Sequence, residues 1–107
     1  TMMSPIRVII YGVGEINQLA TRLIRERGVE IVGAINRAGP KVGRDLGEVA
    51  GLGEDIGVIV SDDAERVLAT PADLVLVGIY SDMERMFPIF QQCLEHNLNV
   101  ISVGEHH

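Results

Sequence analysis

The chain has 107 residues, of which 47% are hydrophobic and only 4% aromatic, and its formal net charge is −6 at pH 7. This length allows one domain with a core of Val, Ile, Leu and Ala, and the twelve glycines suit an α/β fold. The acidic balance argues against nucleic acid as the main partner, because binding along a phosphate backbone needs a basic face. No apolar run approaches the roughly 20 residues of a membrane span, and no signal-peptide pattern is present, so we expect a cytoplasmic location and no membrane partner.

The ends of the sequence contribute no expected chemistry. Thr1 precedes Met2 and Met3, and we expect it to be a residue left by cleavage during preparation. The pair His106 and His107 is either the start of a purification tag or native. We therefore treat residues 1–107 as a single domain.

The first predicted unit is strand, helix, strand. An apolar run predicts a buried strand over residues 6–11, and apolar residues at helical spacing predict a helix over residues 15–27. Gly28 is the expected helix stop. Residues 29–35 are almost uninterruptedly apolar, as expected for a strand of a parallel sheet covered on both faces. The apolar positions assigned to the buried face of the helix are Ile16, Leu19, Ala20, Leu23 and Ile24.

The second half of the chain continues the alternation. After a glycine-rich stretch that allows a short helix over residues 44–50, strands are predicted over residues 57–60, 74–78 and 99–103. The residues Ser61, Asp62 and Asp63 are typical of a helix start, and that helix ends near residue 68. The last helix begins at a capping box formed by residues 81–84, places Cys93 on its apolar side as a core residue, and ends near Asn97.

This order of elements predicts a Rossmann-like, doubly wound parallel sheet with five strands in the order 3-2-1-4-5 and helices on both faces. In such sheets a ligand binds at the carboxyl ends of the strands, where the order reverses between strands one and four. The turn after the first strand and the loop after the fourth strand would both line that crevice.

The turn after the first strand has the pattern G-x-G-x-x-N, which is part of a dinucleotide-binding fingerprint. Gly12 allows a sharp turn, and Gly14 lacks the Cβ that would block a pyrophosphate from the N-terminus of the helix. The expected cofactor-binding residues in this turn are Gly12, Val13, Gly14, Glu15 and Ile16. Asn17 occupies the position where the fingerprint usually has a third small residue. The Glu15 carboxylate would repel a phosphate unless it turned outward.

The loop after the fourth strand supplies the other expected cofactor-binding residues. These are Gly78, Ile79, Tyr80 and Ser81. Tyr80 and Ser81 are in a position to contact the nicotinamide ribose, and the alternative is that both are ordinary loop residues with Ser81 as a helix cap.

The end of the second strand indicates which dinucleotide binds. An NAD site usually has an acidic residue here, which bonds the adenine ribose and repels the 2′-phosphate of NADP. This chain has Asn36, followed by Arg37, with Lys41 and Arg44 further on. A neutral amide beside cations favours NADP over NAD, with Arg37 on the phosphate, unless these cations simply form a solvated loop. The sequence shows no Ser-His-acid set, no paired carboxylates and no metal-ligand cluster.

The chain resembles the N-terminal domain of 2,4-diaminopentanoate dehydrogenase and related dihydrodipicolinate reductase-like proteins. The resemblance covers nearly the whole length. It implies a two-domain NAD(P)-dependent oxidoreductase in which hydride passes between the nicotinamide and a substrate C–N bond, with catalytic groups in a C-terminal domain. The segments that carry the resemblance are residues 11–14 (YGVG), 29–35 (VEIVGAI), 42–47 (VGRDLG), 58–63 (VIVSDD), 93–95 (CLE) and 99–105 (NVISVGE).

Three hypotheses follow. In the first, the chain is the NAD(P)-binding domain of an oxidoreductase acting on a C–N bond of an amino acid or cyclic imine, excised from its catalytic domain and inactive alone. In the second, it is a stand-alone nucleotide-binding or regulatory module without catalysis. In the third, it is a scaffold that binds nothing. An excised domain would expose the fifth strand as a sheet edge, and we expect it to form a homo-oligomer.

Overall fold

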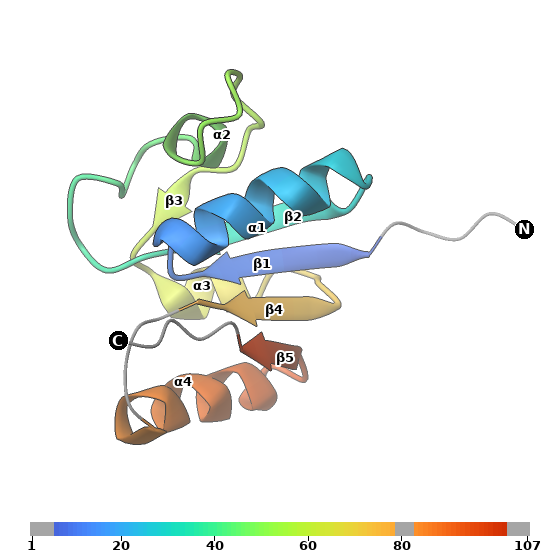
Figure 1. The fold of residues 1–107 in the computed structure, drawn as a ribbon. Helices are drawn as coiled ribbons and strands as arrows, with labels where there is room; N and C mark the ends of the chain where they lie inside the picture. Colours follow the sequence, from blue (N-terminus) through green and yellow to red (C-terminus); the bar gives the residue numbers. More distant parts are fainter. Residues whose placement is uncertain (1–5, 79–82, 103–107) are drawn as a thin grey trace, which may run out of the picture.

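A computed structural model describes residues 6–78 and 83–102, and it shows one sheet of five parallel strands (Figure 1). The spatial order is β3-β2-β1-β4-β5, which confirms the predicted order. The strands are β1 (Arg7–Tyr11), β2 (Glu30–Ile35), β3 (Val60–Ser61), β4 (Leu74–Val77) and β5 (Asn99–Ser102). The central strand β1 pairs with β2 on one side and with β4 on the other, so the order reverses at β1, as expected.

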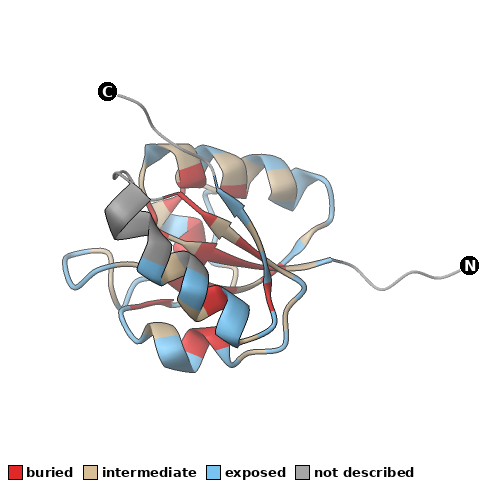
Figure 2. Cartoon of the chain, turned by 90° about the horizontal axis from the view of Figure 1, so that it is seen from below, coloured by how far each residue is buried: buried red, intermediate tan, exposed pale blue. Residues whose placement is uncertain are grey.

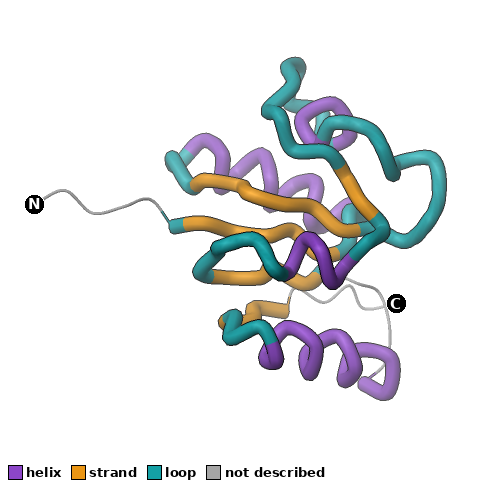
Figure 3. The backbone as a smooth tube through the Cα atoms, turned by 180° about the vertical axis from the view of Figure 1, so that it is seen from behind, coloured by secondary structure: helices purple, strands orange, loops and turns teal. Residues whose placement is uncertain are grey.

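Helices cover both faces of the sheet. The helices are α1 (Glu15–Glu26), α2 (Leu46–Val49), α3 (Ala64–Leu68) and α4 (Met83–Glu95). Figure 3 shows α3 in front of the strands and α1 behind them. One core cluster contains Leu46 of α2 and Ile10 of β1, and the other contains Val67 of α3 and Cys93 of α4. The strands carry nine of the sixteen buried hydrophobic residues in the described stretches (Figure 2).

Cys93 is fully buried, which confirms its prediction as a core residue, and burial raises the pKa of its thiol to about 11. Within the described part of the chain, no helix has both the length and the apolar character needed to cross a membrane.

The two predicted helix stops are confirmed by backbone geometry. Gly28 follows α1 with φ 77°, and Asn97 follows α4 with φ 59°. In both places the N–H groups of the stop residue and of the residue after it donate to carbonyl oxygens of the last helical turn, as in a Schellman motif. Each stop therefore satisfies helix-end carbonyls and turns the chain directly into the next strand.

The buried face of α1 differs from the prediction. Leu19 and Leu23 are each 46% exposed, whereas the polar residues Asn17 and Thr21 are fully buried. The Arg22 side chain, on the flank of α1 turned toward α2, donates a hydrogen bond to the Ala50 carbonyl at 2.8 Å. The helix is thus rotated so that Asn17 lies beneath the end of β1, and both leucines lie partly at the surface.

The β3 edge of the sheet is closed by a loop that Asp45 holds. The predicted strand began three residues too early and ended one residue too early, because residues 57–59 belong to this loop and only Val60–Ser61 pair with β2. The Asp45 carboxylate accepts hydrogen bonds from the backbone N–H groups of Gly47, Ile56 and Gly57 at 2.8–2.9 Å. These bonds, the one from Ile56 foremost, hold the pKa of the buried Asp45 carboxyl below its ordinary value.

The substitution Asp45→Asn should lower the free energy of unfolding by about 1–3 kcal/mol at pH 7, because an amide cannot accept from all three N–H groups. A carboxyl with a lowered folded-state pKa stabilises the protein above its unfolded pKa, near 3.9, and loses that contribution as the pH falls further. The difference between the two proteins in urea unfolding should therefore shrink between pH 5 and pH 3.

The matched control is Asp55→Asn, in the same loop, where the side chain is exposed. A stability difference for Asp45→Asn that stays constant with pH would show that the ionised carboxylate is not what holds the loop.

Candidate functional site

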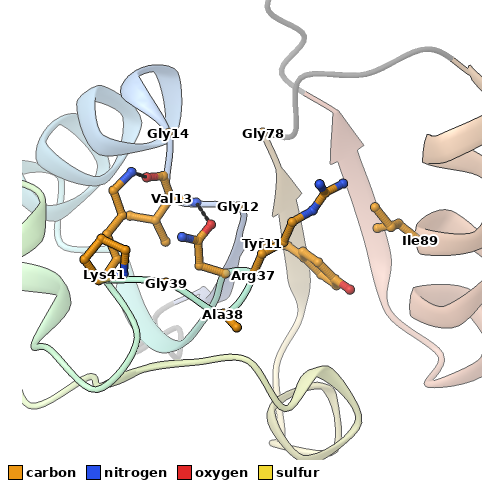
Figure 4. Close-up of a pocket in the computed structure, with 12 residues that line it drawn as sticks. Tyr11, Gly12, Val13, Gly14, Arg37, Ala38, Gly39, Lys41, Gly78 and Ile89 are labelled. Atoms are coloured by element: carbon orange, nitrogen blue, oxygen red, sulfur yellow. Dashed lines mark hydrogen bonds between the residues drawn. The ribbon is translucent and has the colours of Figure 1, made fainter.

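A pocket of about 470 Å³ lies where β1 and β4 end, at the reversal of strand order (Figure 4). Two loops bound it: the glycine turn after β1 and residues 36–41 after β2. From the other side of β1 it receives Gly78, at the end of β4, and Ile89 of α4. The lining residues are Tyr11, Gly12, Val13, Gly14, Asn36, Arg37, Ala38, Gly39, Pro40, Lys41, Gly78 and Ile89.

The glycine turn has the geometry that its sequence requires. Gly12 has φ 93°, a conformation that favours glycine, and its N–H donates to the Ile35 carbonyl at 2.7 Å. Gly14 is the N-cap of α1 and has no side chain to bond the first-turn N–H groups. Glu15 begins the helix and its side chain is exposed, which fits the requirement that this carboxylate turn outward.

The peptide groups of Val13 are held by the loop after β2. The Asn36 side-chain oxygen accepts from the Val13 N–H at 3.1 Å, and Lys41 Nζ donates to the Val13 carbonyl at 2.7 Å. Figure 4 shows both bonds as dashed lines. Gln18 of α1 donates to the same carbonyl at 3.2 Å. The two loops of the pocket are therefore joined at Val13.

Asn17 braces the floor of the turn. Its side-chain amide nitrogen donates to the carbonyl oxygens of Gly12 at 2.8 Å, Leu76 at 3.2 Å and Tyr11 at 3.3 Å. The reversed amide would point its oxygen at three other oxygens, so this network fixes its orientation. A Cβ built on Gly78 would lie 2.5 Å from Asn17 Cγ, so the glycine at the end of β4 makes room for the amide. In the sequence Asn17 is a departure from the dinucleotide-binding fingerprint, whereas in the structure its side chain links β1, the turn and β4.

The predicted cluster of cations divides into two parts. Arg37 and Lys41 line the pocket, whereas Arg44 lies outside it and pairs with Glu48 of α2. Among the described residues, neither Arg37 nor Lys41 has a carboxylate within ion-pair distance. In Figure 4 the Arg37 side chain extends away from Lys41, toward the Ile89 side of the pocket.

Some residues of the pocket were not predicted from the sequence. Tyr11 precedes Gly12 and forms part of the wall, and burial raises the pKa of its hydroxyl, which donates to Gln92 of α4 at 3.2 Å. Its position at the carboxyl end of β1, beside the expected crevice, could have identified Tyr11 as a pocket residue from the sequence. Ile89 lines the pocket because of the way α4 packs, and no local pattern in the sequence predicts that packing.

The remaining expected residues are placed as follows. Gly12, Val13, Gly14, Asn36, Arg37 and Gly78 all line the pocket, and Glu15 and Ile16 begin the helix beside it. Ile79, Tyr80 and Ser81 lie outside the described residues. Across the stretches 6–78 and 83–102, no three His, Cys, Asp or Glu side chains gather as a possible metal site. The described part of the pocket thus offers backbone donors, one neutral amide and two cations, a set suited to holding an anionic ligand.

The chain matches a family model described as dihydrodipicolinate reductase, N-terminus, over residues 6–104. It is 41% identical over 73 residues to a 4-hydroxy-tetrahydrodipicolinate reductase of Anaeromyxobacter dehalogenans, covering 65% of this chain. It is 31% identical over 106 residues, 96% of the chain, to a 2,4-diaminopentanoate dehydrogenase of Acetoanaerobium sticklandii. Among solved structures, an amine dehydrogenase from Mycobacterium smegmatis superposes on 92% of the chain with a TM-score of 0.87 and 41% identity.

These relatives are all much longer than this chain. The chain spans 26% of the reductase and 30% of each dehydrogenase. The similarity to the two dehydrogenases, over 96% and 92% of this chain, takes in nearly the whole parallel sheet described above.

The contact between Asn17 and Gly78 can be tested by a double-mutant cycle. Gly78→Ala should destabilise the protein, by about 1–3 kcal/mol, because the new Cβ overlaps the buried amide. In an Asn17→Ala background the same change should cost clearly less, since the overlapping atoms are gone. Chemical unfolding of the four proteins gives the coupling free energy.

The control for inserting a methyl group near the pocket is Gly39→Ala, where the nearest atom to a built Cβ is 3.8 Å away. Additive effects of Asn17→Ala and Gly78→Ala would contradict the interlocked packing.

Proposed function

Because this chain belongs to the family of dihydrodipicolinate reductase N-terminal domains, we propose that it is the NADP-binding domain of an oxidoreductase acting on a C–N bond of an amino acid or cyclic imine. The observation that carries this proposal is the pocket at the strand-order reversal, bounded by the glycine turn and by the Asn36–Lys41 loop. That is the place where doubly wound sheets bind dinucleotides.

The names of the relatives support the reaction class. They describe a reductase, an amine dehydrogenase and a diaminopentanoate dehydrogenase, and the chain covers 26–30% of each. A bound nicotinamide cofactor would supply hydride transfer, which can interconvert an amine and an imine. The residues of this chain would hold and orient it, with Gly12 and Gly14 giving its phosphates access to the backbone of the turn.

The preference for NADP over NAD is proposed from the end of β2. Asn36 stands where a carboxylate would repel a 2′-phosphate, and the exposed Arg37 guanidinium has no carboxylate partner among the described residues. A planar guanidinium can bind a phosphate with two parallel hydrogen bonds. Arg37 would have to turn from the Ile89 side of the pocket toward the β2 end to do so, and its exposure allows that motion.

A second candidate is a nucleotide-binding module without catalysis. The observation that favours it is that no His, Cys, Asp or Glu is present among the described residues that line the pocket. The same observation fits the first proposal if the acid and base groups come from the rest of a longer protein. The two candidates differ in whether the parent protein turns over an amine or imine substrate.

Calorimetric titration of the folded 107-residue chain with NADPH and with NADH should give saturable binding, with NADPH the tighter ligand. Binding of neither dinucleotide would contradict the proposed function of this chain on its own. Equal affinity for NADPH and NADH would support a dinucleotide site and contradict the preference for NADP.

The double substitution Asn36→Asp with Arg37→Ala should reverse this preference toward NADH. An aspartate can still accept the Val13 N–H bond while repelling the 2′-phosphate, and removing the guanidinium removes its attraction. The change in the ratio of dissociation constants should be at least about tenfold, the value of one charge-assisted hydrogen bond. Arg25→Ala, on the exposed end of α1, is the control for a lost positive charge. An unchanged ratio would place the 2′-phosphate elsewhere.

A further inference from the structure

Lys41 holds a position that the phosphate preference at β2 does not explain. It follows the Asn36–Pro40 segment, yet its ammonium reaches back to the glycine turn and donates to the Val13 carbonyl at 2.7 Å. Val13 directly precedes Gly14, the N-cap of α1. The ammonium therefore lies beside the first turn of the helix, where a dinucleotide would place its pyrophosphate.

The turn has one backbone donor fewer than its sequence suggests. The Val13 N–H is directed to the side-chain oxygen of Asn36 at 3.1 Å, so it does not point into the pocket as a free donor. An ammonium has three N–H donors, and the Val13 carbonyl engages one of them. Lys41 thus brings further donors and a full positive charge to the side of the turn where Val13 contributes none.

The electrostatics of this position favour an anion. The N-terminus of α1 carries the positive end of the helix dipole, so the helix itself disfavours a cation nearby. Arg7, Arg44 and Arg66 each have a carboxylate within ion-pair distance, whereas Lys41 has none among the described residues. The Glu15 side chain is exposed and makes no ion pair with Lys41. A bound phosphate would balance both the ammonium and the helix end.

We propose that Lys41 is the charged donor to the pyrophosphate of the dinucleotide, bridging that group and the Val13 carbonyl, while Arg37 serves the 2′-phosphate. This inference rests on the proposed function and adds to it a division of labour between two cations. The lysine would contribute to affinity for NADPH and NADH alike, and the arginine to the choice between them.

The test compares Lys41→Met with Arg37→Met, using NADPH, NADH and adenosine 2′-monophosphate as separate calorimetric ligands at low salt. Lys41→Met should weaken both dinucleotides about tenfold or more, with their ratio unchanged and with no effect on adenosine 2′-monophosphate, which lacks a pyrophosphate. Arg37→Met should weaken NADPH and adenosine 2′-monophosphate and leave NADH unchanged.

Two further variants separate charge at this position from general effects. Lys41→Arg keeps a cation and should recover part of the dinucleotide affinity, and Arg25→Met removes a positive charge from the exposed end of α1 and should change nothing. Thermal unfolding of each variant checks that the fold is intact.

Each outcome has a distinct meaning. Loss of NADPH and adenosine 2′-monophosphate binding in Lys41→Met, with NADH unaffected, would assign Lys41 to the 2′-phosphate and overturn the inference. Unchanged binding of all three ligands would show that the lysine only links the two loops. If the unsubstituted chain binds neither dinucleotide, the proposed function itself fails, which the first titration reveals.

Discussion

The turn at Gly12 determines where every other part of the pocket lies. Its positive φ angle turns the chain sharply at the end of the central strand, and its N–H bond to the Ile35 carbonyl fixes it against β2. The turn exposes both peptide groups of Val13 to the neighbouring loop and starts α1 at once. Because a residue with a Cβ is strained in this conformation, the geometry depends on glycine.

Local signals in the sequence predicted most of the architecture. The apolar runs, the glycine turn and the helix stops at Gly28 and Asn97 are each decided within a few residues of the chain. All of them hold in the structure except the bounds of the third strand, which pairs with β2 only over Val60–Ser61. The orientation of α1 was missed because hydrophobic periodicity assigns Leu19 and Leu23 to the core. The buried amide of Asn17 finds its partners on β1 and β4, which no local pattern records.

The backbone of the pocket could be predicted from the sequence, whereas its side-chain contacts could not. Backbone positions at strand ends follow from topology, so Gly12, Gly14 and Gly78 were expected beside one another and do line one cavity. Side-chain contacts do not follow: proximity in sequence grouped Lys41 with Arg44, yet one side chain reaches the turn and the other pairs with Glu48 on the surface. The partner that each of these side chains reaches depends on the path of the loop. Asp45 holds that loop through backbone N–H groups eleven and twelve residues away.

The packing of Asn17 against Gly78 also makes these two positions dependent on each other in any redesign of the turn. A side chain at position 78 would overlap the Asn17 amide, so an asparagine at position 17 packs without overlap only against a glycine at position 78. A protein engineer who transfers this turn to another scaffold therefore has to transfer the end of β4 with it, although the two positions are sixty-one residues apart in the chain.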